Sequence, residues 1–93
     1  MASVKEEEII NILDYLSTPI KAEDILEAKY TNNENHNYIK IKIKMRSEIE
    51  ASHIIDFLET YLAEAFNNDL ASVKLQINYR TEIAIAEIVD YFS

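Results

Sequence analysis

The residues in this sequence whose type and spacing best suit chemistry are basic side chains that recur at every second position. In the segment NYIKIKIKMR, which contains no acid, apolar residues alternate with Lys40, Lys42, Lys44 and Arg46. A second alternating segment, 72–80, adds Lys74 and Arg80. Because alternate residues of a β-strand point to the same side of a sheet, this spacing gathers the six cations on one polar face. We take them as the candidate binding residues, and their chemistry is the binding of anions.

Three interpretations of this basic face remain open. Lysine in an exposed strand blocks edge pairing, and neighbours roughly 7 Å apart in water repel by only about 0.6 kcal/mol, so no partner is required. The face can instead bind an acidic protein surface, either of another protein or of a second copy. The third interpretation is nucleic-acid binding, although the alternation places no aromatic side chain for base stacking among the basic residues. The net charge of −8 also repels a polyanion.

Acidic residues outnumber basic ones, 17 to 9, and fall mostly in segments that we expect to be helical. A candidate acidic face consists of Glu6, Glu7, Glu8, Asp14, Glu59 and Glu64. Such a face can imitate the spacing of phosphates or dock in a basic groove, and its field would speed association with a basic target. The ordinary explanation is that exposed helix surfaces carry charge. An abundance of residues with AT-rich codons, chiefly Ile, Asn, Lys and Tyr, indicates an AT-rich genome, such as many bacteria, phages and archaeal viruses have. The small acidic format without cysteine or glycine fits a viral or mobile-element inhibitor.

Little in the sequence supports catalysis or cofactor binding. Glycine is absent, which excludes the glycine-rich loops that hold phosphates, and cysteine is absent, which excludes disulfides and thiolate sites. His53 has carboxylates one helical turn to either side, at Glu50 and Asp56, but helical metal sites combine several such groups. The only other histidine, His36, falls in an expected loop. We therefore predict a non-enzymatic protein with no metal and no cofactor.

Apolar periodicity predicts three helices and at least two strands. The helices are expected at 4–16, 48–66 and 81–92, and the strands at 38–46 and 72–80. Two capping boxes, Ser3–Glu6 and Ser47–Glu50, would open the first two helices.

Two segments allow two structures. Residues 20–31 fit either a helix to about Tyr30 or a strand over 24–31 that forms a hairpin with the next strand. We expect a short helix to about residue 26, with the rest of the segment, 26–31, extended. In 81–92 the apolar spacing is helical, whereas Ile83-Ala-Ile85 could prolong the preceding strand, and we expect the helix.

The order strand, long helix, strand is a βαβ unit, yet each of its strands has one polar face. Parallel neighbours covered on both faces would be apolar throughout. We therefore expect another antiparallel strand between them, from 26–31 or from a second copy, or a sheet with one open face. The edges of so small a sheet must also be covered or paired. The predicted fold is a single α+β domain over 1–93, a small two-layer sandwich with helices on one side of the sheet, which forms a homodimer.

The sequence as a whole predicts a small acidic protein-binding module. We expect a viral or mobile-element inhibitor of a host protein that handles nucleic acid; the alternative is a nucleic-acid-binding protein that uses the lysine-lined face. No apolar run approaches the roughly 20 residues of a membrane-spanning helix, and three acids near the start stand where a signal peptide would be basic. With cysteine absent, we expect a reducing, cytoplasmic setting and no membrane partner.

Overall fold

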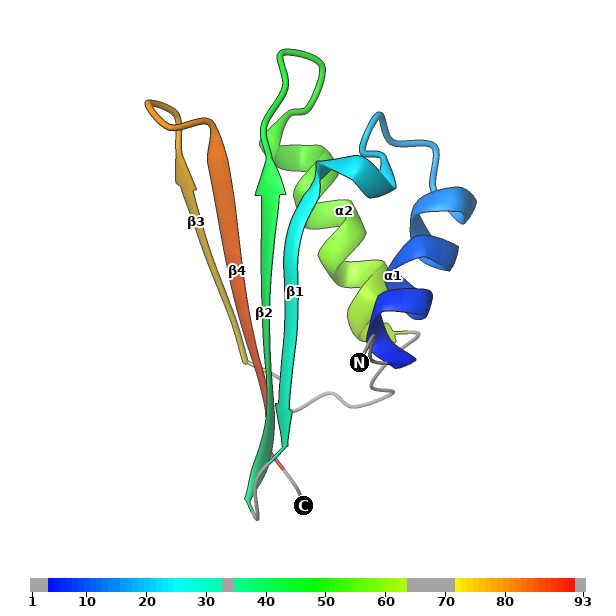
Figure 1. The fold of residues 1–93 in the computed structure, drawn as a ribbon, viewed down its shortest axis with the longest axis vertical. Helices are drawn as coiled ribbons and strands as arrows, with labels where there is room; N and C mark the ends of the chain where they lie inside the picture. Colours follow the sequence, from blue (N-terminus) through cyan, green and yellow to red (C-terminus); the bar gives the residue numbers. More distant parts are fainter. Residues whose placement is uncertain (1–3, 33–34, 64–71, 92–93) are drawn as a thin grey trace.

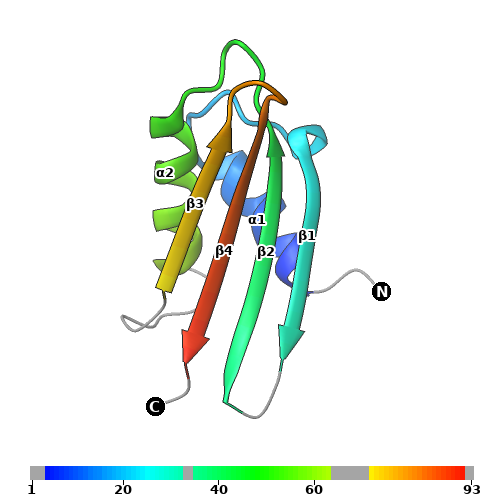
Figure 2. The same ribbon diagram turned by 90° about the vertical axis from the view of Figure 1, so that its left-hand side faces the viewer.

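The computed structural model describes residues 4–32, 35–63 and 72–91. In these residues the chain forms, in order, α1 (Val4–Tyr15), a 3-10 turn η1 (Ala22–Asp24), β1 (Ile25–Asn32), β2 (His36–Lys44), α2 (Ala51–Tyr61), β3 (Ser72–Asn78) and β4 (Ile83–Tyr91). The strands make one sheet in the order β1-β2-β4-β3, with every neighbouring pair antiparallel. Both helices lie on the same side of the sheet (Figure 1), and Figure 2 shows its other side uncovered by any described helix or strand.

The α+β prediction is confirmed, and so is the open face of the sheet, but the strands differ in number and position. A strand does separate the segments predicted at 38–46 and 72–80. That strand is β4, and not 26–31 or a strand from a second copy. Residues 26–31 belong to β1, which pairs with β2 as a hairpin at one edge of the sheet. The short helix expected before residue 26 is reduced to the single turn η1.

The prediction of a helix over 81–92 is wrong, because residues Ile83–Tyr91 form the strand β4. Its sequence is rich in isoleucine and valine, whose branched side chains pack well on a pleated surface and are restricted in a helix. Apolar residues occupy both faces of the strand, so the alternation that usually marks a strand is hidden. The alternative interpretation, in which Ile83-Ala-Ile85 extends the sheet, is the correct one.

A turn without glycine connects β3 to β4. Glu82 has a φ of 59°, in the left-handed region that glycine or asparagine usually fills. The side-chain oxygen of Asn78 accepts hydrogen bonds from the backbone N–H groups of Arg80, at 3.0 Å, and Thr81, at 3.1 Å. Asparagine holds turns by such bonds to the backbone ahead of it. The chain therefore reverses direction here and returns as β4.

The helix boundaries differ from the predicted ones by a few residues. Helix α2 begins at Ala51 instead of residue 48, with Glu50 as its N-cap. The backbone N–H of Glu50 donates to Nδ1 of His53 at 2.9 Å, so His53 fills the part of the capping box that the sequence assigned to Glu50. Helix α1 ends at residue 15, and Ser3 and the predicted end of the second helix lie outside the described residues.

The hydrophobic core lies between the sheet and the helices. From the two central strands it takes six residues that are at most 1% exposed: Ile39, Ile41, Ile43, Ala84, Ala86 and Ile88. From the helices it takes Ile9, Ile12, Leu13, Ile54, Phe57, Leu58 and Tyr61. The rings of Phe57 and Tyr61 have centroids 6.1 Å apart. The core thus combines small residues of β4 with large aromatic residues of α2, the alternation by which packed layers interdigitate.

A matched pair of substitutions in β4 tests the strand assignment. Ile88 is fully buried on the helix side, whereas Ile85 is half-buried on the opposite side. We expect Ile88→Ala to lower the free energy of unfolding by about 3 kcal/mol and Ile85→Ala by about 1 kcal/mol. A helix would put these two residues on one face, so equal losses in denaturant unfolding would contradict the strand.

Candidate interaction surface

The side of the sheet that faces away from the helices is the candidate surface, and we call it the open face. The strand registers arrange its residues in rows that cross β1, β2, β4 and β3 in that order. The rows are Thr31–Tyr38–Val89–Ser72, Lys29–Lys40–Glu87–Lys74, Glu27–Lys42–Ile85–Gln76 and two shorter ones, Lys44–Ile83–Asn78 at one end and His36–Tyr91 at the other. The residues of β2 that alternate with those of the open face, Ile39, Ile41 and Ile43, point to the other side of the sheet, into the core.

The open face brings together four of the six predicted basic residues. Three lysines come from β2 and one from β3: Lys40, Lys42, Lys44 and Lys74. Lys29 of β1 joins them, directly opposite Lys40. Lys29 is not among the predicted residues because the sequence leaves the pairing of 26–31 open. Arg80 lies exposed in the turn between β3 and β4.

Glutamates neutralise only part of this positive charge. Glu27 contacts Lys42 at 3.6 Å, and Glu87 lies in register between Lys40 and Lys74. The open face therefore has five lysines against two glutamates, an excess of three positive charges. Beyond its edge, Glu82 in the turn contacts Lys44 at 3.5 Å. Ion pairs as exposed as these contribute little to stability, so the lysine side chains can change partners at small cost.

An apolar stripe crosses the middle of the open face. Its members are Ile83 and Ile85, which lie opposite Lys44 and Lys42 of β2, and Val89, which lies opposite Tyr38; Glu87 separates Ile85 from Val89. They are half-buried, and the methylene stems of the neighbouring lysines can cover them while the ammonium groups stay in water. A depression of about 650 Å³ lies at the end of the stripe, with Lys42, Gln76 and Asn78 in its lining. The stripe could not be foreseen from the sequence, because the apolar spacing of this segment predicts a helix.

The aromatic residue Tyr38 also lies on the open face, next to the row that contains Lys40, contrary to the expectation that no aromatic side chain would lie among the lysines. Its hydroxyl donates to Oε2 of Glu87 at 2.5 Å. This hydrogen bond to a carboxylate, together with burial, raises the pKa of Tyr38 above its ordinary value, so the phenol is neutral at physiological pH. Tyr38 lies near one end of the face, in the row next to the His36–Tyr91 pair.

Arg46, predicted on the basic face, is instead engaged by the buried carboxylate of Asp24. Its Nε lies 2.8 Å from Oδ1 and its Nη2 2.9 Å from Oδ2, a two-point pairing. The same Nη2 donates to the carbonyl oxygen of Pro19 at 2.6 Å. Arg46 follows β2 and Asp24 precedes β1, so the pair ties the loop after α1 to the sheet. Hydrogen bonds from Arg46 hold the pKa of Asp24 below its ordinary value, although burial acts in the opposite direction.

The predicted acidic residues that can be placed lie on the helix side of the molecule. Asp14 of α1 and Glu59 of α2 are exposed. Glu6, Glu7 and Glu8 fall within α1, and Glu64 lies outside the described residues. The helices therefore carry acids while the opposite side of the sheet carries an excess of lysines.

The described residues give no group of three or more His, Cys, Asp or Glu side chains that could hold a metal ion. His53 uses its Nδ1 to accept the hydrogen bond that caps α2. Within the same residues, no helix combines the length and the apolar character needed to cross a bilayer.

Removing the Asp24 carboxylate tests the structural role of Arg46. Asp24 is 3% exposed, but the Arg46 side chain is 30% exposed. We therefore expect Asp24→Ala to lower the free energy of unfolding by about 2 kcal/mol, less than for a fully buried pair. Glu23→Ala, at the exposed neighbouring position, should change it by less than about 0.5 kcal/mol. Similar losses of unfolding free energy in both variants would contradict this structural role of the Asp24–Arg46 pair.

The pairing of Asp24 with Arg46 should also make the stability of the fold depend on pH. Because the pKa of Asp24 is lowered in the folded state, its contribution is complete above the unfolded pKa of about 3.9 and is lost as the pH falls below that value. The stability gap between the wild type and Asp24→Ala should thus be wide at pH 7 and narrow at pH 3. Urea unfolding at the two pH values measures it, and a gap that widens in acid would rule the linkage out.

Comparisons of this chain with models of protein families, with curated proteins and with solved structures found no match. Its function has to be argued from its own residues.

Proposed function

We propose that this chain is a non-enzymatic protein-binding module, that it works as a homodimer, and that the open face of its sheet binds an acidic partner protein. One observation carries the proposal: three half-buried β-branched residues of β4, with Glu87 between Ile85 and Val89, lie in the middle of a face that has excess positive charge and no described helix or strand over it. The absence of cysteine still favours a reducing, cytoplasmic setting.

The apolar stripe supports a docking surface. An antiparallel sheet with one solvated face usually presents polar residues there, and β3 does so with Ser72, Lys74, Gln76 and Asn78. The central strand β4 instead presents Ile83, Ile85 and Val89, with Glu87 as its one charged residue there. Protein interfaces commonly have an apolar centre inside a polar rim. With β2 and β3 on either side of β4, the open face has this arrangement.

The charge distribution supports a partner of acidic character. The chain as a whole has a net charge of −8, yet the open face has the opposite sign. An acidic surface would meet the lysines of β2 and lose little by displacing their weak pairs with Glu27 and Glu82. The exposed acids of the helix side, such as Asp14 and Glu59, support a second contact with a basic protein. We propose that this basic partner is a host protein that handles nucleic acid. The present chain would then be a viral or mobile-element inhibitor of that host protein.

Capture of partners from the native host tests the open face. Proteins retained by the wild type and identified by mass spectrometry should bind at least about tenfold more weakly to Ile85→Asp, because a charge would then be desolvated at the centre of the interface. The double variant Lys40/Lys42→Glu should weaken this binding further and remove the dependence of the affinity on salt concentration. Asp56→Asn, on the exposed side of α2, is the matched control and should bind normally. Equal binding by all variants would show that the open face is not the contact.

Nucleic-acid binding is the second candidate, and the observation that favours it is the row of three lysines beside Tyr38 on the open face. Polarisation of labelled single-stranded RNA and DNA at low and moderate salt tests it. For a protein-binding module we expect no binding below micromolar concentrations. Salt-dependent binding that disappears in Lys40/Lys42/Lys44→Ser would establish nucleic acid as the ligand in place of an acidic protein.

A further inference from the structure

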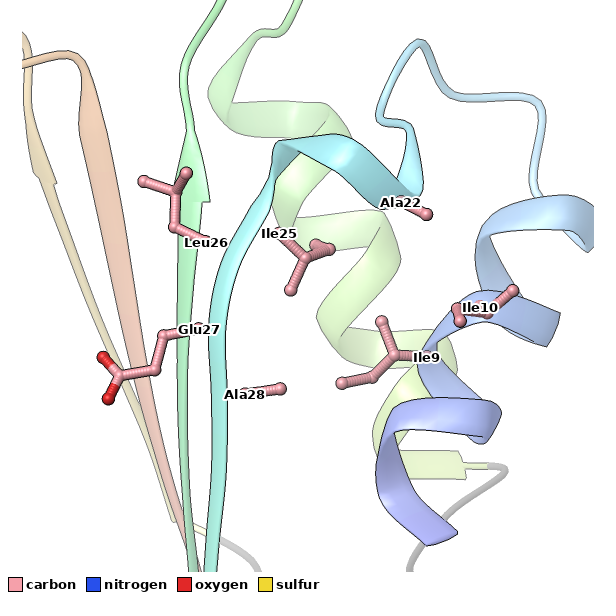
Figure 3. Close-up of a pocket in the computed structure, with 7 residues that line it drawn as sticks. All are labelled: Ile9, Ile10, Ala22, Ile25, Leu26, Glu27 and Ala28. Carbon is pink, nitrogen blue, oxygen red and sulfur yellow. The ribbon is translucent and has the colours of Figure 1, made fainter. Parts of the chain in front are cut away.

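The outer side of β1 is an edge of the sheet beside an apolar groove. No described strand pairs with this side (Figure 2), so backbone N–H and C=O groups along it are available to another strand. A cavity of about 270 Å³ opens next to it between α1, η1 and β1. Figure 3 shows Ile9 and Ile10 of α1 across this groove from Ile25, with Leu26 and Glu27 turned to the opposite side of β1. Ile10 is 46% exposed and Leu26 is 51% exposed.

We infer that β1 pairs antiparallel with β1 of a second copy about a two-fold axis at Ala28, which joins the two sheets into one. This inference rests on the proposed homodimer and names its interface. A two-fold contact uses the same patch of both copies, so the patch has to be complementary to itself.

The charges of β1 give this self-complementarity at one register. With the axis at Ala28, Glu27 of each copy lies opposite Lys29 of the other, which makes two cross-strand ion pairs. An axis one residue earlier places Glu27 opposite Glu27, and an axis one residue later places Lys29 opposite Lys29. Like charges directly opposite each other destabilise a sheet, so both neighbouring registers are disfavoured.

Within one copy, Lys29 lacks the acidic neighbour that this register would supply. It lies directly opposite Lys40, a like charge, and no ion pair to Lys29 is found in the described parts of the chain. Glu27 contacts Lys42 at 3.6 Å. In the dimer, Glu27 would lie between Lys42 of its own chain and Lys29 of the second copy, and the repulsion in the row of Lys29 would be relieved.

The groove accepts an apolar residue from the second copy. In the same register Tyr30 of the second copy falls level with the irregular start of β1, and Tyr30 belongs to the side of β1 that faces the helices, the side opposite to Leu26. Tyr30 is 36% exposed. Its ring would therefore approach the mouth of the groove near Ile10, and apolar area left exposed by the monomer would be buried.

The geometry of β1 permits the pairing, and the other edge offers no equivalent. The irregularity in β1 lies between Ile25 and Glu27, so the register is continuous from Glu27 to Asn32. The other edge strand, β3, has a single charged residue, Lys74. No two-fold register of β3 can therefore place opposite charges across it.

Charge reversal at position 29 separates the dimer from the monomer. In one copy, Lys29→Glu replaces a like charge opposite Lys40 with an opposite one, so the monomer should become more heat-stable at low protein concentration. In the dimer the introduced carboxylate would lie opposite Glu27 of the other copy, so we expect dimerisation, measured by analytical ultracentrifugation, to weaken by about tenfold or more. Asp56→Lys on α2 makes a charge change of the same size and opposite sign away from β1 and should leave the dimer intact.

Mixing two variants restores the complementarity. Lys29→Glu carries two acids on β1 and Glu27→Lys carries two lysines, so each should dimerise poorly alone and the mixture should form a heterodimer. Native mass spectrometry resolves the three species. Folding of each variant is checked by circular dichroism, because Glu27→Lys also removes the contact with Lys42.

Cross-linking tests the register independently. The natural chain has no cysteine, so a single introduced thiol reports one position. Across the axis the two Ala28 residues face each other with Cα atoms about 4.5–5.5 Å apart, within the range of a disulfide, and Ala28→Cys should oxidise rapidly to a covalent dimer. The two Thr31 residues would be about 20 Å apart, so Thr31→Cys should not.

The outcomes separate this interface from the proposed function. A dimer that Lys29→Glu disrupts and the mixture restores supports the inference, as does selective cross-linking of Ala28→Cys. If Lys29→Glu does not weaken the dimer, or if Thr31→Cys cross-links as readily as Ala28→Cys, the β1 interface is overturned. The homodimer would then form through another surface. A monomer at millimolar concentration overturns both the interface and the homodimer, while capture of partners by the open face is judged by its own assay.

Discussion

The pairing of β2 with β4 is the contact on which the rest of the structure depends. Its register runs from His36 opposite Tyr91 to Lys44 opposite Ile83 without interruption. Because side chains alternate across a strand, this one register assigns every residue of both strands to a face. It sends Ile41 and Ala86 into the core and leaves Lys42 and Ile85 on the open face. A slip by one residue would bury lysines under the helices, at a cost that no contact in this small domain could offset. The core and the candidate surface are thus two consequences of the same pairing.

The sequence predicts the strand that carries the lysines because its two faces differ so clearly. In β2 isoleucine and lysine alternate, and only an extended chain separates them. In β4 both faces are mostly apolar or small, with one acid each at Glu87 and Asp90, so Ile85, Ile88 and Val89 satisfy helical spacing as well as they satisfy a strand. What decides between the two is pairing with β2, nearly 50 residues away along the chain. Periodicity is a local property and cannot contain that information. The turn at Asn78 and Glu82 holds the only local signal, and it lacks the glycine by which hairpins are usually recognised.

The basic residues show a similar limit for the candidate site. Spacing alone groups Arg46 with the lysines, yet the structure uses it to hold Asp24 and the carbonyl of Pro19. Arginine presents a planar fork that matches a carboxylate at two points, and lysine does not. The single arginine in the run is therefore the residue best suited to a structural pair, while the lysines that precede it stay available at the surface. Its partner lies 22 residues earlier in a segment that the sequence left ambiguous, so the pairing could not be foreseen.

The two proposed surfaces are compatible because they use different parts of the same sheet. A two-fold axis at Ala28 is perpendicular to the plane of the sheet. The open faces of both copies would therefore lie on one side of the joined sheet and the helices of both copies on the other side. Joining the copies through β1 would therefore not cover Ile85 or the lysines of β2; it would double the positive excess on one continuous surface. A partner with two acidic sites, or with a repeated one, would then be held by both copies at once, and the second contact would form at the high effective concentration set by the first. Weak contacts of exposed lysines, each worth little alone, can in this way give a stable complex.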